Sequence, residues 1–476
     1  MNSRSLCAAV LTLFLMSGCV PKIDKAAPVS ETTLNAELEK NMGAFGDETL
    51  ETDWWKRYGD AQLDEIVEKA LSNAPSLQSI EARYAQANTI IQSIQSYERP
   101  HLLASGSVLR ERFSANHIFP PPLGGSTFTQ YQPGLVLEYD FDFWNERKSR
   151  ILAAQNNAMA EKAYIEASKL ALASAICETY LSWHYDERRG ALLDELDKTT
   201  QEELAIVEKQ YRLGLIDAVA VHEKKAARSQ IAQRISELHR SIEGKKESIG
   251  VLGGFLPSDV EAMKAPHIRE GLEPLLPREI VLNLLAHRPD VAMAKYTALS
   301  KSHTIEQAKA QFYPNVSLSG FLGFTSFNWS RLFERSSYSP SAGIAASLPL
   351  LDWGARTANL QNSVSDYNSS VYEYNQAVIT AANEVVVLLK QNALLQSQIA
   401  LHQEEMHARQ ANAAIARRQL SLGLSNKLPY LSERKTVLES AMGTLMLEES
   451  GSLIRINLIR SLGGGYADKG EENASR

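Results

Sequence analysis

Apolar residues occupy every second position in the nine residues before Trp144, and the positions between them are mostly acidic. The apolar positions are Leu135, Leu137, Tyr139, Phe141 and Phe143, and the positions between them are Val136, Glu138, Asp140 and Asp142. A period of two residues indicates a β-strand with one apolar face and one largely acidic face. Residues 101–112 are its expected partner, and the intervening loop is rich in proline and glycine. The pattern therefore predicts a β-hairpin that ends just before Trp144.

A second hairpin is expected at residues 315–324 and 343–351. The apolar face of its first strand carries Val316, Leu318, Gly320 and Leu322. Aromatic residues gather near its loop, at Phe324, Phe327, Trp329, Phe333 and Tyr338. Strands that are apolar on one face and polar on the other, with aromatic residues at their ends, are typical of transmembrane barrels. A hairpin of a soluble β-sandwich is the alternative that the same pattern allows.

Two very long helices are predicted after the hairpins. Residues 355–422 contain neither glycine nor proline, and residues 145–213 contain one glycine and no proline. Helices in globular domains average about 11–12 residues, whereas runs of this length would reach about 100 Å. Each run ends in a Leu-Gly-Leu turn, at 213–215 and at 422–424. We expect each long helix to pack against two shorter helices placed end to end.

The return helix of the first repeat carries an apolar seam at coiled-coil spacing. Its residues are Ile231, Ile235, Leu238, Ile242 and Ile249. This seam predicts that the core of the protein is built by helices packed side by side.

The same elements occur twice because the chain contains an internal repeat. Trp144 and Trp353 lie 209 positions apart, as do Gly214 and Gly423. Two long copies favour a pseudo-symmetric architecture over a solenoid. The expected parts are a signal peptide (1–18), an N-terminal anchor and equatorial segment (19–74), a first repeat (75–254), an equatorial insertion (255–288), a second repeat (289–465) and a disordered tail (466–476).

Four strands per chain are too few for a closed membrane barrel. An open sheet edge in lipid leaves backbone groups without hydrogen bonds, and bacterial single-chain barrels start at about eight strands. We therefore expect a barrel that is shared between chains. The pattern alone leaves two or three chains open.

The N-terminus has the features of an export signal. Arg4 precedes an apolar run at residues 6–16, and Ser17-Gly18-Cys19 follows. This arrangement resembles a bacterial lipobox, with Met16 where leucine is preferred, and predicts lipidation of Cys19. An ordinary secretory peptide with an incidental cysteine is the alternative. No later run of 18 apolar residues occurs, so no transmembrane helix is expected and a membrane would be crossed by strands.

Composition and motifs argue against several functions. The net charge of −7 with mixed signs gives no basic surface for nucleic acid. No nucleotide-binding, metalloprotease or nucleophile-elbow motif occurs. Polar residues at 184–187 and 402–405 fit solvated helix faces better than metal sites, and Cys177 fits a small core residue. We expect no enzymatic activity, no cofactor and no metal.

The most recognisable motifs resemble those of a known family. They are Trp54-Trp55, Tyr139-Asp140-Phe141-Asp142-Phe143-Trp144, Tyr211-Arg212-Leu213-Gly214-Leu215, His287-Arg288-Pro289-Asp290, Phe312-Tyr313-Pro314, Leu348-Pro349-Leu350-Leu351-Asp352-Trp353-Gly354 and Ser461-Leu462-Gly463-Gly464-Gly465. Together they span nearly the whole mature chain and are similar to TolC-like outer-membrane factors, in the lipid-anchored NodT-type subgroup. The resemblance implies an α+β membrane protein, a trimer whose 12-stranded transmembrane β-barrel continues into a periplasmic α-helical barrel.

The resemblance also implies a function and site residues. The protein would be a passive duct in the bacterial outer membrane for drugs or other small toxic compounds, joined by a periplasmic adaptor to an inner-membrane transporter. Its adaptor-docking tip would be Leu213, Gly214, Leu215, Leu422, Gly423 and Leu424. Its periplasmic gate would be Leu428, Ser432, Glu433 and Lys435, with Glu223 as an acidic residue from the first repeat. Ser432 stands where relatives carry aspartate.

Two further expectations concern the lumen and the rival function. Glu138, Asp140 and Asp142 would face inward and make the barrel lumen negative. The main alternative is a periplasmic coiled-coil structural or adaptor lipoprotein without a pore. That alternative accounts for the helices and Cys19, but it leaves the duplicated alternating strands unexplained.

Overall fold

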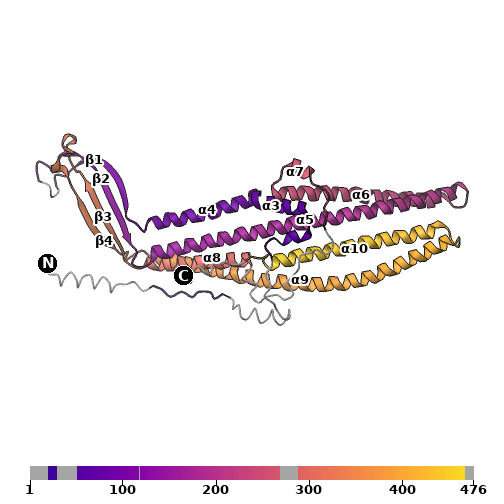
Figure 1. Ribbon diagram of the computed structural model, residues 1–476. Helices are drawn as coiled ribbons and strands as arrows, with labels where there is room; N and C mark the ends of the chain where they lie inside the picture. The colour runs from indigo at the N-terminus through magenta and orange to yellow at the C-terminus, as the bar shows by residue number, and fades with distance from the viewer. Residues whose placement is uncertain (1–19, 29–50, 117, 119, 269–287, 467–476) are drawn as a thin grey trace. The chain divides into compact units, whose positions relative to one another are not determined.

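The computed structural model describes residues 20–28, 51–116, 118, 120–268 and 288–466 (Figure 1). The chain divides into two compact units. Unit 1 comprises Met1–Pro28, Arg83–Glu161 and Ala294–Tyr374, and unit 2 comprises Val29–Ala82, Lys162–Met293 and Asn375–Arg476. The sheet belongs to unit 1, and the helix-to-helix turns belong to unit 2.

The two repeats fold into matching series of elements. The first series is α4 (Pro75–Ser96), β1 (His101–Arg112), β2 (Thr127–Phe141), α5 (Glu146–Arg212) and α6 (Ala218–Gly253). The second series is α8 (Pro289–Ala310), β3 (Asn315–Gly323), β4 (Ser341–Ser347), α9 (Ala355–Ser421) and α10 (Lys427–Ser461). Helices α5 and α9 each have 67 residues, and α4 and α8 each have 22. The expected hairpins and long helices are confirmed.

The sheet of unit 1 is antiparallel, with the order β1-β2-β3-β4. Residues that lie directly opposite one another share a face, so Leu137 shares a face with Leu102 and Gly320, and Glu138 with His101 and Ser319. One face, here called the apolar face, carries Leu102, Ala104, Val108, Tyr131, Leu135, Leu137, Tyr139, Phe141, Val316, Leu318, Leu322, Ala342, Ile344 and Ala346. The other, the polar face, includes Ser105, Ser107, Gln130, Gln132, Glu138, Asp140, Asn315, Ser317, Ser319, Ser341 and Ser347.

Two strands end earlier than the alternation predicts. Strand β2 ends at Phe141 rather than Phe143, because Asp142 turns its carboxylate to the backbone of α5. Strand β4 runs from Ser341 to Ser347 rather than from 343 to 351. Its early end follows from Pro349, since proline has no N–H to donate to a strand ladder.

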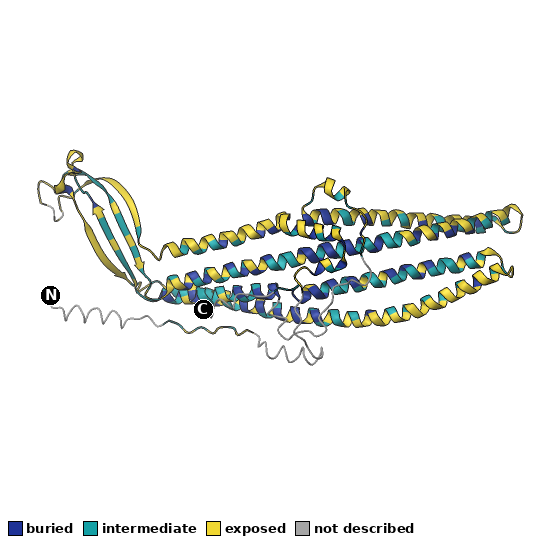
Figure 2. Ribbon diagram, viewed as in Figure 1, coloured by how far each residue is buried: buried dark blue, intermediate teal, exposed yellow. Residues whose placement is uncertain are grey.

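The largest core of unit 2 forms where the N-terminal segment meets the long helices (Figure 2). Trp54, Trp55 and Tyr58 of η1 (Trp54–Tyr58) and Leu63 of α3 (Ala61–Asn73) are buried there with residues of α5, α6 and α10. The core also contains the seam residues Ile242 and Ile249, while Ile231 is buried in a second cluster. Tyr180 of α5 donates a hydrogen bond of 2.7 Å to Asp60, the N-cap of α3. The predicted seam is therefore confirmed as core.

Short helices meet end to end at two joints in unit 2, as expected from the sequence. Gly254 follows α6 with φ of +68°, and a Cβ at that position would lie 2.6 Å from Pro75, the first residue of α4. At the second joint, Arg288 precedes α8 and donates a hydrogen bond of 3.0 Å to the carbonyl of Ser461, the last residue of α10. Glycine is needed at the first joint, because both a positive φ and the close approach exclude a side chain.

Cys177 lies fully buried in the main core of unit 2. Burial raises the pKa of its thiol well above the ordinary range, so at neutral pH the group is an unreactive thiol rather than a thiolate. We expect Cys177 of the folded, processed protein to resist a maleimide reagent at pH 7.5 and to react fully after denaturation. Peptide mass spectrometry of the labelled protein checks this, and rapid labelling of Cys177 in the folded state would contradict it.

One described helix has the length and composition of a membrane helix, although none was expected from the sequence. Within the described residues, α9 contains an 18-residue window with a mean hydropathy of 1.3, which is apolar and long enough to cross a membrane by composition, although only 28% of it is buried. The few charged residues in this window do not lower its mean hydropathy enough to exclude a membrane helix by composition. Glu384, however, lies in α9 and binds Arg288 and Arg460 at 2.9 and 3.3 Å. Such ion pairs favour packing of α9 against other helices rather than a passage through lipid.

Candidate functional site

The acidic residues of the sheet lie on its polar face. Glu138 lies opposite His101 on β1 and Ser319 on β3, and Asp140 lies opposite Ser317. Both carboxylates are on exposed residues. The hydroxyls around them are small, so the charges are not covered by neighbouring side chains. This face can present a negative surface to water.

The apolar face has no cover within the described chain. Leu102 and Val108 of β1 and Ile344 of β4 are 64–73% exposed. Exposed apolar side chains in a continuous row mark a surface that faces another apolar phase. Strands β1 and β4 also have no described neighbour on their outer edges. The described sheet therefore has an exposed apolar face and two edge strands that are open to partners.

Asp142 does not lie on the predicted lumen-facing strand. Its two carboxylate oxygens accept hydrogen bonds from the backbone N–H groups of Arg147 and Lys148, at 3.1 and 2.9 Å. Asp352 caps α9 of the second repeat in a similar way, through Gly354 and Arg356. An acidic side chain satisfies the free N–H groups at the start of a helix and is favoured by the helix dipole. We therefore assign Asp142 to the capping of α5, and its predicted place in the lumen stays a prediction.

The two Leu-Gly-Leu turns have the same geometry. Gly214 and Gly423 each have φ of +72°. The N–H groups of Leu215 and Leu424 bond to carbonyls five residues earlier, at 3.0 and 2.9 Å, and the glycine N–H groups to carbonyls three residues earlier. This is the Schellman arrangement that ends a helix with a left-handed glycine. Asp217 and Asn426 then cap the returning helices α6 and α10.

The turns present leucine side chains to the outside. Leu213, Leu215, Leu422 and Leu424 are 63–74% exposed. Four large apolar side chains on two rigid turns are unlike the polar residues that usually occupy exposed loops. The turns thus have the chemistry of a contact surface.

The residues expected to form a gate follow the second turn. Leu428 is half-buried, Ser432 is exposed and Glu433 is partly exposed, while Glu223 of α6 is exposed. Lys435 differs from the expectation in one respect, because its ammonium group binds Glu203 of α5 at 3.2 Å. Glu203 is buried and also binds Lys224 of α6 at 3.0 Å. Glu203 gives no signal in the sequence, because it lies inside a long helical run with no motif around it.

Ion pairs join α5 to α10 along much of unit 2. They are Glu202–Lys427 at 2.8 Å, Glu203–Lys435 at 3.2 Å, Glu195–Arg434 at 3.6 Å and Arg188–Glu448 at 3.1 Å. Arg189 also binds Glu449 at 2.5 Å and contacts the buried Asp186. Burial alone would raise the pKa of Asp186, but hydrogen bonds from Lys245, Arg189 and Ser241 hold it below its ordinary value. The Asp186 carboxylate is thus ionised and links α5 to α6.

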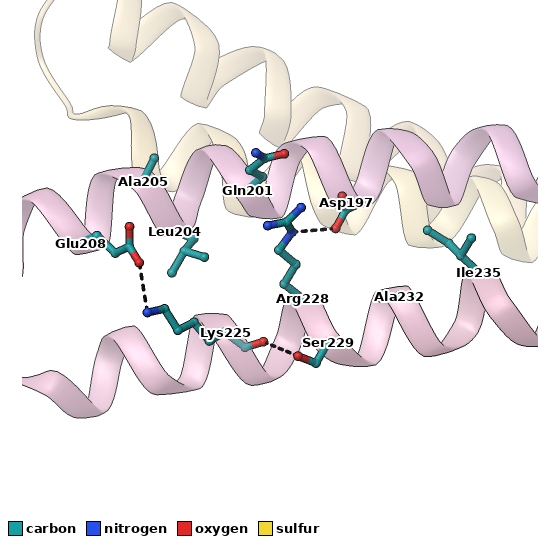
Figure 3. A pocket seen from close by; sticks show the side chains of 10 residues that line it. All are labelled: Asp197, Gln201, Leu204, Ala205, Glu208, Lys225, Arg228, Ser229, Ala232 and Ile235. Carbon is teal, nitrogen blue, oxygen red and sulfur yellow. Dashed lines mark hydrogen bonds and ion pairs between the residues drawn. The ribbon is translucent and has the colours of Figure 1, made fainter.

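A groove lies between α5 and α6, close to the first turn in sequence, with a volume of about 810 Å³ (Figure 3). Arg228 binds Asp197 at 3.1 Å and Lys225 binds Glu208 at 3.2 Å across it. Leu204, Ala205, Ala232 and Ile235 supply its apolar lining. Because its charges are paired, the groove has the features of a gap between helices rather than of a catalytic pocket.

The described residues offer no metal-binding constellation. No group of three or more His, Cys, Asp or Glu side chains in that part of the chain could hold a metal ion. His184 and His402, which lie in the polar stretches noted in the sequence, contact the backbone carbonyls of Pro266 and Ser440 at 3.3 and 2.9 Å. Both histidines thus have structural hydrogen-bond partners.

The segment after the predicted lipidation site lies along unit 1. Cys19 itself is outside the described residues. Val20 and Ile23 pack against a cluster formed by α8 and α9, and Ala26 donates a hydrogen bond of 2.8 Å to Asn368. The cluster includes Phe312, three residues before β3 begins. Residues 20–26 therefore lie next to the junction between the helices and the sheet of unit 1.

Comparison with known proteins gives consistent results. The family model described as outer membrane efflux protein matches residues 66–249 and 281–464. The multidrug resistance outer membrane protein MdtP of Escherichia coli K12 is 26% identical, over 97% of this chain and 96% of the relative. The putative multidrug resistance outer membrane protein MdtQ of Shigella flexneri is 25% identical, over 75% of this chain and 76% of the relative.

Solved structures have the same fold. The outer membrane protein VceC of Vibrio cholerae matches with a TM-score of 0.79 and 25% identity, over 87% of this chain and 99% of that protein. The CmeC outer membrane channel of Campylobacter jejuni matches with a TM-score of 0.81, over 96% of this chain and 97% of that protein, at 20% identity. At this identity, the match to CmeC shows the fold alone.

Proposed function

Because the chain belongs to the outer membrane efflux protein family and is an outer-membrane channel of an efflux system, we propose that it works as a homotrimeric, lipid-anchored exit duct for drugs or other small toxic compounds. The sheet carries this proposal. Its exposed apolar face and two unpaired edges are understandable only in lipid and beside further strands. Three copies of four strands make a closed barrel of 12, in which β4 of one protomer pairs with β1 of the next.

The polar face of the sheet would line the lumen. Glu138 and Asp140 would then give the pore a negative potential that attracts cations. In planar bilayers we expect Glu138→Gln/Asp140→Asn to lower the cation selectivity, measured by the reversal potential in a salt gradient, while the protein still assembles.

The matched control for this selectivity change is Glu81→Gln/Glu237→Gln, which removes two exposed carboxylates from helices α4 and α6. It should leave the reversal potential unchanged. An unchanged reversal potential in the strand variant as well would contradict the lumen assignment, and absence of any conductance in the wild type would contradict a channel.

The partners would be a periplasmic adaptor and an inner-membrane transporter. The support is the pair of turns with exposed leucines, Leu213, Leu215, Leu422 and Leu424. Apolar side chains on rigid turns can be buried by a partner at little cost in conformational entropy. Transport through a passive duct needs no cofactor, so energy would come from the inner-membrane partner, and we propose no enzymatic activity.

The gate would lie just after the second turn, at Leu428, Ser432, Glu433 and Lys435. Glu223 of the first repeat would add an acidic residue to it. The ion pair of Lys435 with the buried Glu203 supports a role of Lys435 in holding α10 against α5. A serine at position 432 carries no charge, so Glu433 or Glu223 would supply the acidity of the entrance.

The lipid anchor would be attached at Cys19. The packing of Val20 and Ile23 beside the helix-sheet junction supports it, since an acyl group attached one residue before Val20 would join the chain close to the membrane end of unit 1. More than one acyl chain gives stable anchoring, at about 0.8 kcal/mol per buried methylene. A pore-free lipoprotein, the alternative from the sequence, accounts for the long helices but leaves the exposed apolar face of the sheet without a role.

A further inference from the structure

The apolar face of the sheet changes character toward the end that carries the loops. From Leu102 to Val108 on β1 its residues are apolar, and their partners on β2 run from Leu137 to Tyr131. Beyond Val108 and its partner Tyr131, the same face carries Arg110, opposite Thr129, and Arg112, opposite Thr127. Both arginines are exposed. The lipid-facing side thus ends in two cationic residues rather than in apolar ones.

Aromatic residues separate the apolar band from the arginines. Tyr131 lies edge-on to Trp329 of η3 (Trp329–Arg331), with ring centroids 5.3 Å apart. At the opposite end of the same strand, Tyr139 and Phe141 contact each other at 5.0 Å. The ten residue steps from Tyr131 to Phe141 span roughly 34 Å along the strand, or roughly 24 Å across a membrane at a tilt of about 45°. This agrees with the apolar band of about 25 Å in transmembrane barrels.

Arg110 then falls at the depth of the lipid headgroups, and Arg112 lies at the outer edge of that layer, where its long side chain can reach back to a phosphate. Arg110 lies two residues beyond the level of Tyr131, or roughly 5 Å farther along the membrane normal, and Arg112 roughly 10 Å farther. The headgroup layer on each side of the hydrocarbon core is about 5–8 Å thick. Arginine binds phosphate in a bidentate manner, as a planar fork of donors.

Among the described residues, no protein group competes for these side chains. In the part of the chain that the structure describes, neither Arg110 nor Arg112 has an ion-pair or hydrogen-bond partner for its guanidinium group. Glu111, which lies between them in sequence, points to the polar face with Phe128 as its partner on β2. The two positive charges on the lipid side are therefore not neutralised by that carboxylate.

We propose that Arg110 and Arg112 bind the phosphate groups of an anionic lipid in the outer leaflet, with Tyr131 and Trp329 packed at the hydrocarbon boundary below. The site rests on the proposed function, because it needs the apolar face to lie in the outer membrane with the loops outside. It gives the barrel a fixed depth and a preferred lipid. Its ligand is the phosphorylated headgroup of a lipid embedded in the membrane, not free phosphate.

The test measures lipid binding to the full-length processed protein in detergent by native mass spectrometry. The probe is diphosphoryl lipid A, titrated against the wild type, Arg110→Gln/Arg112→Gln and the charge-matched control Arg83→Gln/Arg240→Gln on helices α4 and α6. We expect equal binding by the wild type and the control, and binding weaker by about tenfold or more in the strand variant. Arg110→Lys/Arg112→Lys should lie between them, because lysine keeps the charge without the fork.

Three results would overturn the site. Equal lipid A binding by the wild type and the strand variant would show that the arginines do not contribute. An equal loss in the helix control would show a general charge effect. Displacement of lipid A by inorganic phosphate at the same concentration would show a site for the free anion. Conductance of the same samples separates this inference from the proposed function: a conducting strand variant with normal lipid binding refutes only the lipid site, whereas a wild type that forms no channel refutes the function.

Discussion

Replacement of Gly423 by proline is expected to reduce the drug resistance of cells to that of cells without the protein. Gly423 has φ of +72°, whereas proline requires about −65° and has no N–H for the bond to the carbonyl of Leu420. The misfit costs about 3 kcal/mol or more, enough to remodel a turn that contains Leu422 and Leu424. The helices beyond the turn keep their ion pairs, so chains should still assemble. Growth in the presence of a transported drug measures the loss.

Two companion variants make this prediction specific to the turn. Leu422→Glu/Leu424→Glu keeps the glycine and the fold, since both side chains are exposed, but places charge on the proposed contact, and it should lose resistance equally. Gly125→Pro introduces the same conflict at φ of +85° in the β1–β2 loop and should leave resistance intact. Full resistance in both turn variants would show that the turns do not bind the adaptor.

Replacement of Arg288 by methionine is expected to lower the free energy of unfolding strongly. Only 9% of the Arg288 side chain is exposed, and it binds Asp290 at 2.8 Å, Glu384 at 2.9 Å and the Ser461 carbonyl at 3.0 Å. Removing one partner of a buried ion pair costs about 3–5 kcal/mol. We expect roughly 3 kcal/mol, the lower end, because Arg460 remains 3.3 Å from Glu384. Far-UV circular dichroism during denaturant unfolding in detergent measures the change.

The exposed pair Arg409–Glu405 offers the matched control. It lies within α9 at 2.7 Å, with both side chains more than 40% exposed. Exposed pairs contribute about 0–1 kcal/mol, so Arg409→Met should shift the unfolding midpoint much less. Equal shifts for the two variants would mean that the joint between α8 and α10 is not held by Arg288.

Most elements could be predicted from the sequence because their signals are local. The alternation over residues 135–141 and the proline-free runs of α5 and α9 need no knowledge of distant residues. The strand ends were harder, since Asp142 continues the alternation while its carboxylate binds the backbone of α5. A side chain that can either extend a strand or cap a helix gives no sign of its choice in the pattern.

The geometry of the two turns was predictable because a repeated motif marks them, whereas the contacts between distant helices were not. Gly214 and Gly423 occur in repeated Leu-Gly-Leu turns, which the structure reproduces with identical φ. Glu203 and Lys435 are 232 positions apart, and no periodicity connects a buried carboxylate to a lysine on another helix. The arginines of the apolar face likewise acquire meaning only from the strand register, which places Arg110 on the same face as Val108 and Tyr131.

The central claim is that the four-stranded sheet closes only with sheets of other chains. The mass of the membrane-extracted protein in detergent, determined by light scattering with the detergent contribution subtracted, tests it most directly. We predict three processed chains per particle and no release of protein from membranes without detergent. A monomer that stays in solution without detergent would contradict the shared barrel, because the apolar face and both sheet edges would then have no partner.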